Sequence, residues 1–90
     1  MDPGLKLASL CKALGHPARV AIVHYLASQR QGAQCRDIAG QLPLAQSTVS
    51  QHLAALRKAG FLVTEGIPPR VMYRLDLKAV ESFRRAVALL

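Results

Sequence analysis

The sequence predicts a mainly α-helical domain that carries one small β-hairpin near its C-terminal end. Apolar residues recur at helical spacing from about residue 5 to residue 59, and over residues 61–75 the pattern changes to the alternation typical of β-strands. Ninety residues is one domain's length, so we expect residues 1–90 to form a single unit. With 51% hydrophobic and 19% charged residues, the chain can build a packed core and is not a disordered tail.

Two helices are predicted at the start of the chain. The first spans about residues 5–14, because four residues share one helical face: Leu7, Leu10, Cys11 and Leu14. Gly15 ends this helix, and Pro17 opens the second one at a first-turn position that tolerates proline. The second helix is expected to run to about residue 29 with a broad apolar face.

A short helix and a longer one follow. The short helix is predicted over about residues 36–42, and the longer one over about residues 46–59. Val49, Leu53 and Leu56 form the inward stripe of the longer helix, which Gly60 ends. Ala45 stands where a capping hydroxyl is usual, which forgoes about 1 kcal/mol.

The hairpin and a last helix complete the chain. Strands are predicted over residues 61–65 and 70–75, joined by the turn at residues 66–69. The last helix, about residues 77–90, carries an apolar seam of the kind that pairs with another helix: Val80, Phe83, Val87 and Leu90. Helix, short helix, helix and hairpin is the order of a winged helix-turn-helix domain.

The charge balance points to a polyanionic partner. Twelve Lys and Arg against five Asp and Glu give a formal net charge of +7, which suits nucleic acid or an anionic membrane surface. Four aromatic residues are too few for the stacking that holds single strands, so double-stranded nucleic acid is favoured. No apolar run approaches the ~20 residues of a membrane helix. An acid at position 2 replaces the lysines of a secretory signal, which predicts a cytoplasmic protein without a membrane partner.

The outer face of the helix at residues 46–59 is unusual because the helix contains no acid, whereas an ordinary solvated face mixes Glu and Lys. Small hydroxyls and an amide near its N-terminus can donate to and accept from base edges, and its alanines allow close approach to a groove. Arg57, Lys58 and Arg70 can take phosphates. The alternative is a polar face with no partner.

Three stretches resemble the ArsR/SmtB family of bacterial winged-helix repressors: residues 14–20, residues 46–53 and residues 56–62. The resemblance covers about residues 5–75. It implies a homodimer through the first and last helices, bound to a palindromic operator at the nucleoid. It also places Arg70 on the wing. On the fourth helix it implies the following DNA-contacting residues: Gln46, Ser47, Thr48, Ser50, Gln51 and His52.

The chain departs from the family at its two common metal sites. Where many members carry Cys-x-Cys-Asp-Leu, this chain has Gln34, Cys35 and Arg36 followed by Asp-Ile, so both ligand positions are replaced. Other members bind zinc on the last helix, but residues 77–90 contain no His or Cys and a single acid, Glu81. We therefore expect neither a metal nor a cofactor, and the sequence does not identify an inducer.

Cys11 and Cys35 leave a sensing role open. Both occupy positions that read as apolar core, which predicts small buried side chains. They could instead form a thiol or redox switch if the fold brings their Cα atoms within ~7 Å. A metalloid-responsive repressor using both cysteines in a non-standard site would need a third ligand.

Three further side chains have structural or functional interpretations. His52 lies beside the apolar stripe, where it either packs, which we favour, or touches a phosphate. His16 is expected to cap the second helix, and Arg19 either braces that helix or reaches the DNA backbone.

The function we expect is sequence-specific binding of double-stranded DNA by a transcriptional regulator, a repressor by resemblance. The alternative is a winged-helix adaptor for protein partners, but such surfaces usually present exposed aromatic anchors, which the outer face of the fourth helix lacks. No carboxylate pair, catalytic triad or phosphate-binding glycine loop is recognisable, so we do not expect an enzyme.

Overall fold

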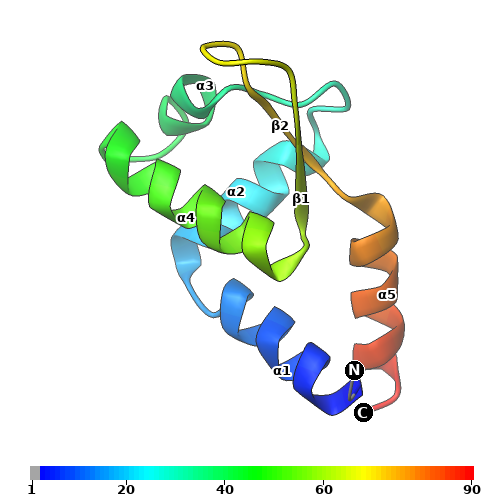
Figure 1. The fold of residues 1–90 in the computed structure, drawn as a ribbon. Coiled ribbons are helices and arrows are strands. Elements are labelled where there is room, and N and C mark those ends of the chain that lie inside the picture. Colours follow the sequence, from blue (N-terminus) through cyan, green and yellow to red (C-terminus); the bar gives the residue numbers. More distant parts are fainter. Residues whose placement is uncertain (1–2) are drawn as a thin grey trace.

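The computed structural model describes residues 3–90, so the argument from the acid at position 2 lies outside the described residues. Residues 3–90 fold as five helices and one antiparallel hairpin, in the predicted order (Figure 1). The elements are α1 (Pro3–Leu14), α2 (Pro17–Ala27), α3 (Cys35–Ala39), α4 (Gln46–Ala59), β1 (Leu62–Glu65), β2 (Met72–Leu75) and α5 (Leu77–Ala88).

Three elements, α2, α3 and β2, are shorter than predicted at an end where turn-forming residues stand. α3 ends at Ala39 instead of residue 42, because Gly40 begins a turn and Pro43 disfavours the helical conformation of the residue before it. α2 ends two residues early, where the Ser28 hydroxyl donates to the Tyr25 carbonyl. β2 starts at Met72, beyond the two prolines of the turn.

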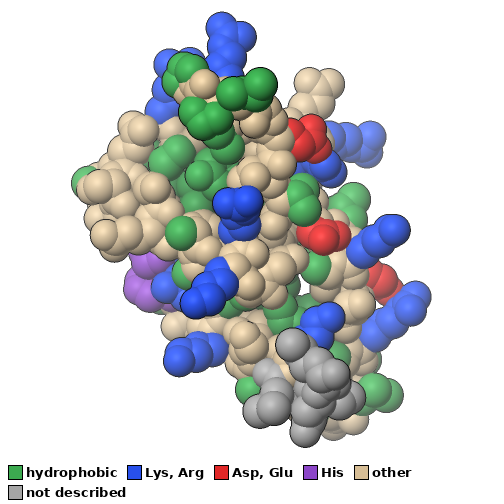
Figure 2. All heavy atoms as spheres, viewed as in Figure 1, with side chains coloured by type: hydrophobic (Ala, Val, Ile, Leu, Met, Phe, Trp, Pro, Cys, Tyr) green, Lys and Arg blue, Asp and Glu red, His purple; other side chains and the backbone are tan. Residues whose placement is uncertain are grey.

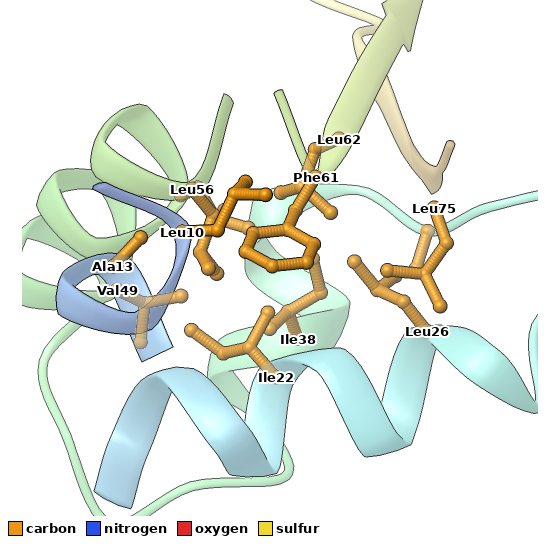
Figure 3. Close-up of a cluster of buried hydrophobic side chains, with 12 residues drawn as sticks. Leu10, Ala13, Ile22, Leu26, Ile38, Val49, Leu56, Phe61, Leu62 and Leu75 are labelled. Atoms are coloured by element: carbon orange, nitrogen blue, oxygen red, sulfur yellow. The ribbon is translucent and has the colours of Figure 1, made fainter. Parts of the chain in front are cut away.

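The core lies between α4 and the other helices, and the close-up in Figure 3 shows its side chains converging from α1, α2, α3 and the base of the hairpin. Val49, Leu53 and Leu56 are fully buried, as the helical spacing predicts. Phe61, just after α4, meets the α5 ring of Phe83 edge-on with centroids 5.5 Å apart. This contact fastens α5 to the core.

The hairpin is held to the helical part by a short bridge. β1 and β2 pair from Leu62 with Leu75 to Glu65 with Met72. Ala33, in the loop before α3, exchanges two backbone hydrogen bonds with Tyr73, at 2.8 and 3.0 Å. Gly32 has a φ of +85°, and a Cβ at that position would lie 2.7 Å from the Tyr73 carbonyl oxygen. The wing is thus positioned by a backbone approach that glycine permits.

The two ends of the molecule are distinct (Figure 1). The start of α1 and the end of α5 lie together at one end, whereas α3 and the hairpin turn lie at the other. α4 runs between these ends. Within residues 3–90, no helix has both the length and the apolar character needed to cross a membrane.

Candidate nucleic-acid interface

α4 presents the candidate interface because one of its sides is buried and the other is open. Its inward stripe packs in the core, while Ser47, Gln51 and Lys58, at spacings of four and seven residues, are exposed on the outer side. Ala45 holds the N-cap position in an extended conformation and makes no side-chain capping bond. Gly60 ends the helix in the left-handed conformation, with φ of +98°.

The structure leaves most of the predicted contact residues accessible. Thr48 is half-buried, and the following are exposed: Gln46, Ser47, Ser50, Gln51, Arg57, Lys58 and Arg70. Arg70 belongs to the turn that links the two strands, where its backbone N–H donates to the Ile67 carbonyl at 2.9 Å. Polar and basic groups are therefore available on α4 and on the wing.

His52 is a correction to the predicted contact set. Its side chain is buried, with 8% of its surface exposed, and its Nδ1 accepts a hydrogen bond from Arg19 Nε at 3.1 Å. Its ring lies 4.5 Å from that of His16, centroid to centroid. Burial lowers the pKa of His52, and the nearby His16 and Arg19 lower it further. His52 therefore lies on the buried side of α4 and does not belong to its outer face.

His16 and Arg19 join α2 to α4 through this contact. His16 occupies the N-cap position of α2, but its side chain makes no capping bond, so the predicted capping role is wrong. Arg19 also donates from Nη1 to the carbonyl oxygen of Ala13 at 3.4 Å. Of the two roles open to Arg19, the structure shows bracing, which links α1, α2 and α4.

The two cysteines are free, with Cys11 in the C-terminal half of α1 and Cys35 at the start of α3. Cys11 is exposed, contrary to the expectation of a core position, and Cys35 is half-buried. The Cys35 Sγ–H donates to the Gln46 carbonyl at 3.8 Å, and burial raises the pKa of the Cys35 thiol.

Metal-ligating residues are dispersed in the part of the chain that the structure describes. Over residues 3–90, no group of three or more His, Cys, Asp or Glu side chains lies close enough together to hold a metal ion. Gln34 is the N-cap residue of α3, and Arg36 follows Cys35 in its first turn.

Negative charge is concentrated away from α4. Figure 2 shows the acidic side chains of this face gathered over the hairpin and α5, on the right of the view. Ion pairs join Arg74 to Glu65 across the hairpin and Arg85 to Glu81 on α5. α1, α2 and α4 contain no Asp or Glu, and neither of these two ion pairs, the ones found in residues 3–90, involves a positive charge of these three helices.

Asp76 is a structural residue that the sequence analysis did not single out. Its carboxylate accepts from the backbone N–H groups of Lys78 and Ala79, at 3.1 and 3.3 Å, and caps α5. The signal was present, because an Asp directly before a helical pattern is typical of an N-cap.

The central part of the chain matches a protein family. Residues 16–64, which include α2, α3 and α4, match the family described as "Bacterial regulatory protein, arsR family". The matched region contains the outer face of α4 and ends in β1.

Characterised relatives match over most of this chain. The HTH-type transcriptional regulator YgaV of Escherichia coli is 32% identical over 83% of this chain and 75% of its own length. The biofilm growth-associated repressor of Agrobacterium fabrum is 37% identical over 78% of this chain, and the transcriptional repressor SmtB of Mycobacterium tuberculosis is 39% identical over 73%. These matches cover 58% and 47% of those two longer proteins.

Solved structures share the fold. Reduced HlyU from Vibrio cholerae aligns with a TM-score of 0.73 at 29% identity, covering 96% of this chain and 86% of that one. The transcriptional repressor BigR from Xylella fastidiosa aligns with a TM-score of 0.72 at 29% identity, covering 96% and 84%. An ArsR-like regulator from a Rhodococcus species has a TM-score of 0.78 at 24% identity over 93% and 77%, which supports the fold alone.

Proposed function

Because this chain belongs to the ArsR family of bacterial DNA-binding transcriptional regulators, we propose that it represses transcription by binding a palindromic operator as a homodimer. In this proposal, the N-terminal half of α4 enters the major groove and the hairpin turn contacts the adjacent backbone. The protein acts in the cytoplasm and is associated with the nucleoid while bound.

The observation that carries the proposal is the acid-free outer face of α4. Ser47 and Gln51, one turn apart, present a hydroxyl and an amide that can donate to and accept from base edges. Carboxylates on this face would repel phosphates, and α4 has none. Arg57 and, on the wing, Arg70 are exposed and supply positive charge beside these polar groups.

The proposed homodimer forms through α1 and α5. Cys11 on α1 is exposed, as are the apolar side chains of Val87 and Leu90 at the C-terminal end, at 41% and 91% of their surface. A second copy would cover these groups with the same surface, as in a two-fold symmetric dimer. Such a dimer would present two copies of α4, so we expect operator half-sites about one helical turn apart.

The experiment is fluorescence anisotropy with a labelled duplex from the region upstream of the gene and a random duplex of equal length. Wild type should prefer the upstream duplex. Ser47→Ala and Gln51→Ala should each weaken that preference by about 1–3 kcal/mol, the value of a good base contact. Gln29→Ala, half-buried after the end of α2, serves as the matched amide control. If wild type ignores both duplexes at low salt, the proposal is wrong.

A further inference from the structure

A surface notch lies where α1, α2 and α4 meet. Its volume is about 370 Å³, and three cationic side chains line it, one from each helix: Lys12, Arg19 and Lys58. Ser9 adds a hydroxyl, while Ala55 on α4 leaves the notch open. We call this feature, defined by its three cations, the basic notch. Lys58 belongs to the predicted contact set, whereas Lys12 has no predicted role and the three cations together are not predicted as a site.

Among the residues that the structure describes, no acidic side chain lines the basic notch. α1, α2 and α4 contain no Asp or Glu, and the ion pairs found in the described residues lie on the hairpin and on α5. By contrast, the neighbouring notch between α1 and α5 carries Lys6 and Lys78 together with Asp76. Three like charges from three helices favour an anion at their centre.

Arg19 is held in place while it keeps its charge. Its Nε donates to His52 Nδ1 and its Nη1 to the Ala13 carbonyl, which are both neutral acceptors. A guanidinium carries five N–H groups, so three of them take no part in these two hydrogen bonds. A side chain fixed in this way loses less conformational entropy when it binds an anion.

The position of the notch along α4 indicates which anion it takes. Lys58 follows Ser47 by eleven residues on the same side of the helix, a separation of about 16 Å at 1.5 Å per residue. The major groove is about 12 Å wide. For an α4 that crosses the groove with Ser47 and Gln51 at base edges, Lys58 lies beyond the groove, over the sugar–phosphate backbone.

We propose that the basic notch binds a backbone phosphate of duplex DNA at the edge of the groove that α4 enters. This inference rests on the proposed function and deepens it. The ammonium groups of Lys12 and Lys58 and the guanidinium of Arg19 donate to the phosphate oxygens. Such a contact fixes the register of α4 on the duplex and carries no sequence information of its own.

The test is the salt dependence of duplex affinity for Lys12→Gln, Lys58→Gln and the double variant, measured by anisotropy on both the upstream and the random duplex. Lys12 and Lys58 are exposed, so the fold should tolerate these changes. Arg30→Gln, exposed in the loop between α2 and α3, removes one charge outside the notch and is the matched control.

Loss of one phosphate contact in each protomer should make the salt slope of a dimer shallower by about 1.8, at about 0.9 per contact. The double variant should therefore show a shallower slope and an equal fold loss on both duplexes, while Arg30→Gln retains the wild-type slope. Equal slopes for the double variant and wild type would overturn the notch assignment, as would an equal change in Arg30→Gln. Failure of wild type to bind any duplex would instead overturn the proposed function.

Discussion

His52 shows how a single side chain of α4, the helix proposed to contact DNA, can face the core instead. The sequence places it one residue after Gln51, beside the apolar stripe, where packing and phosphate contact are both compatible with the pattern. The choice depends on Arg19, 33 residues earlier, which donates to its Nδ1. Long-range partners of this kind leave no local signal, so the sequence favoured packing but could not identify Arg19 as the partner.

The same contact makes stability depend on pH. Burial and the charges of His16 and Arg19 lower the pKa of His52 below its ordinary 6.5, so the folded state binds fewer protons than the unfolded state in that range. The contribution of His52 is complete above pH 6.5 and is lost as the pH falls through 6.5 toward the lower folded pKa. The loss cannot exceed about 1.4 kcal/mol per pH unit, the limit for one proton.

Urea denaturation from pH 7.5 to 5 at fixed protein concentration should therefore show falling stability for wild type. His52→Gln, which keeps an acceptor but cannot be protonated, should show a flatter profile. Parallel profiles for the two proteins would contradict this assignment of the pH dependence.

The N-cap residues of α4 and α5 give two opposite predictions for the stability of the protein. Ala45 makes no side-chain cap, whereas Asp76 accepts two backbone N–H groups. Ala45→Ser should raise the free energy of unfolding by about 1 kcal/mol, and Asp76→Ala should lower it by about the same amount. Urea denaturation at fixed protein concentration measures both. An unchanged midpoint for Ala45→Ser, with the expected loss in Asp76→Ala, would mean that α4 is capped in another way.

The attachment of the wing gives a second prediction at this scale. Gly32 has a positive φ and a close approach to the Tyr73 carbonyl, so Gly32→Ala should cost about 2 kcal/mol or more. Gly40 has a φ of −64° and ordinary space for a Cβ, so Gly40→Ala should be neutral or slightly stabilising. Thermal unfolding of the two variants separates these cases, and equal effects would show that the bridge does not position the wing.

The existence and order of the elements followed from the sequence, because each rests on local periodicity. α4 matches its predicted bounds, residues 46–59, since Gly60 ends it and its apolar stripe is regular. α3 was predicted three residues too long at its C-terminal end because Leu42 continues the apolar pattern, while the conformational restriction imposed by Pro43 overrides it. The bridge from Ala33 to Tyr73 spans 40 residues and could not be inferred from either strand alone.

At the scale of the whole molecule, the two ends have separate tasks in this account. The wing and the N-terminal half of α4 are proposed to face DNA, and α1 and α5 are proposed to face the second copy. Cys11, predicted as core from its place in the helical repeat, is exposed in the single chain. The sequence shows which residues are apolar, but not whether their partner belongs to the same chain or to another.

The dimer is therefore testable by size. Light scattering after gel filtration should give twice the 9.7 kDa chain mass for wild type. Val87→Asp places a charge in the proposed contact and should yield monomers at micromolar concentration, because burying an unpaired charge is costly. Lys78→Asp, exposed at the N-terminal turn of α5 on the other side of the helix, should remain dimeric. A monomeric wild type, or a dimeric Val87→Asp, would contradict the proposed interface.

The central claim, that α4 and the wing contact DNA, is tested most directly by an NMR titration. Backbone amide shifts of ¹⁵N-labelled protein would be followed as the upstream duplex is added at low salt. The largest changes are expected at residues 46–51 and 66–70, together with line broadening, and smaller changes are expected along α5. Changes confined to α5 or to α3, with residues 46–51 unaffected, would contradict it.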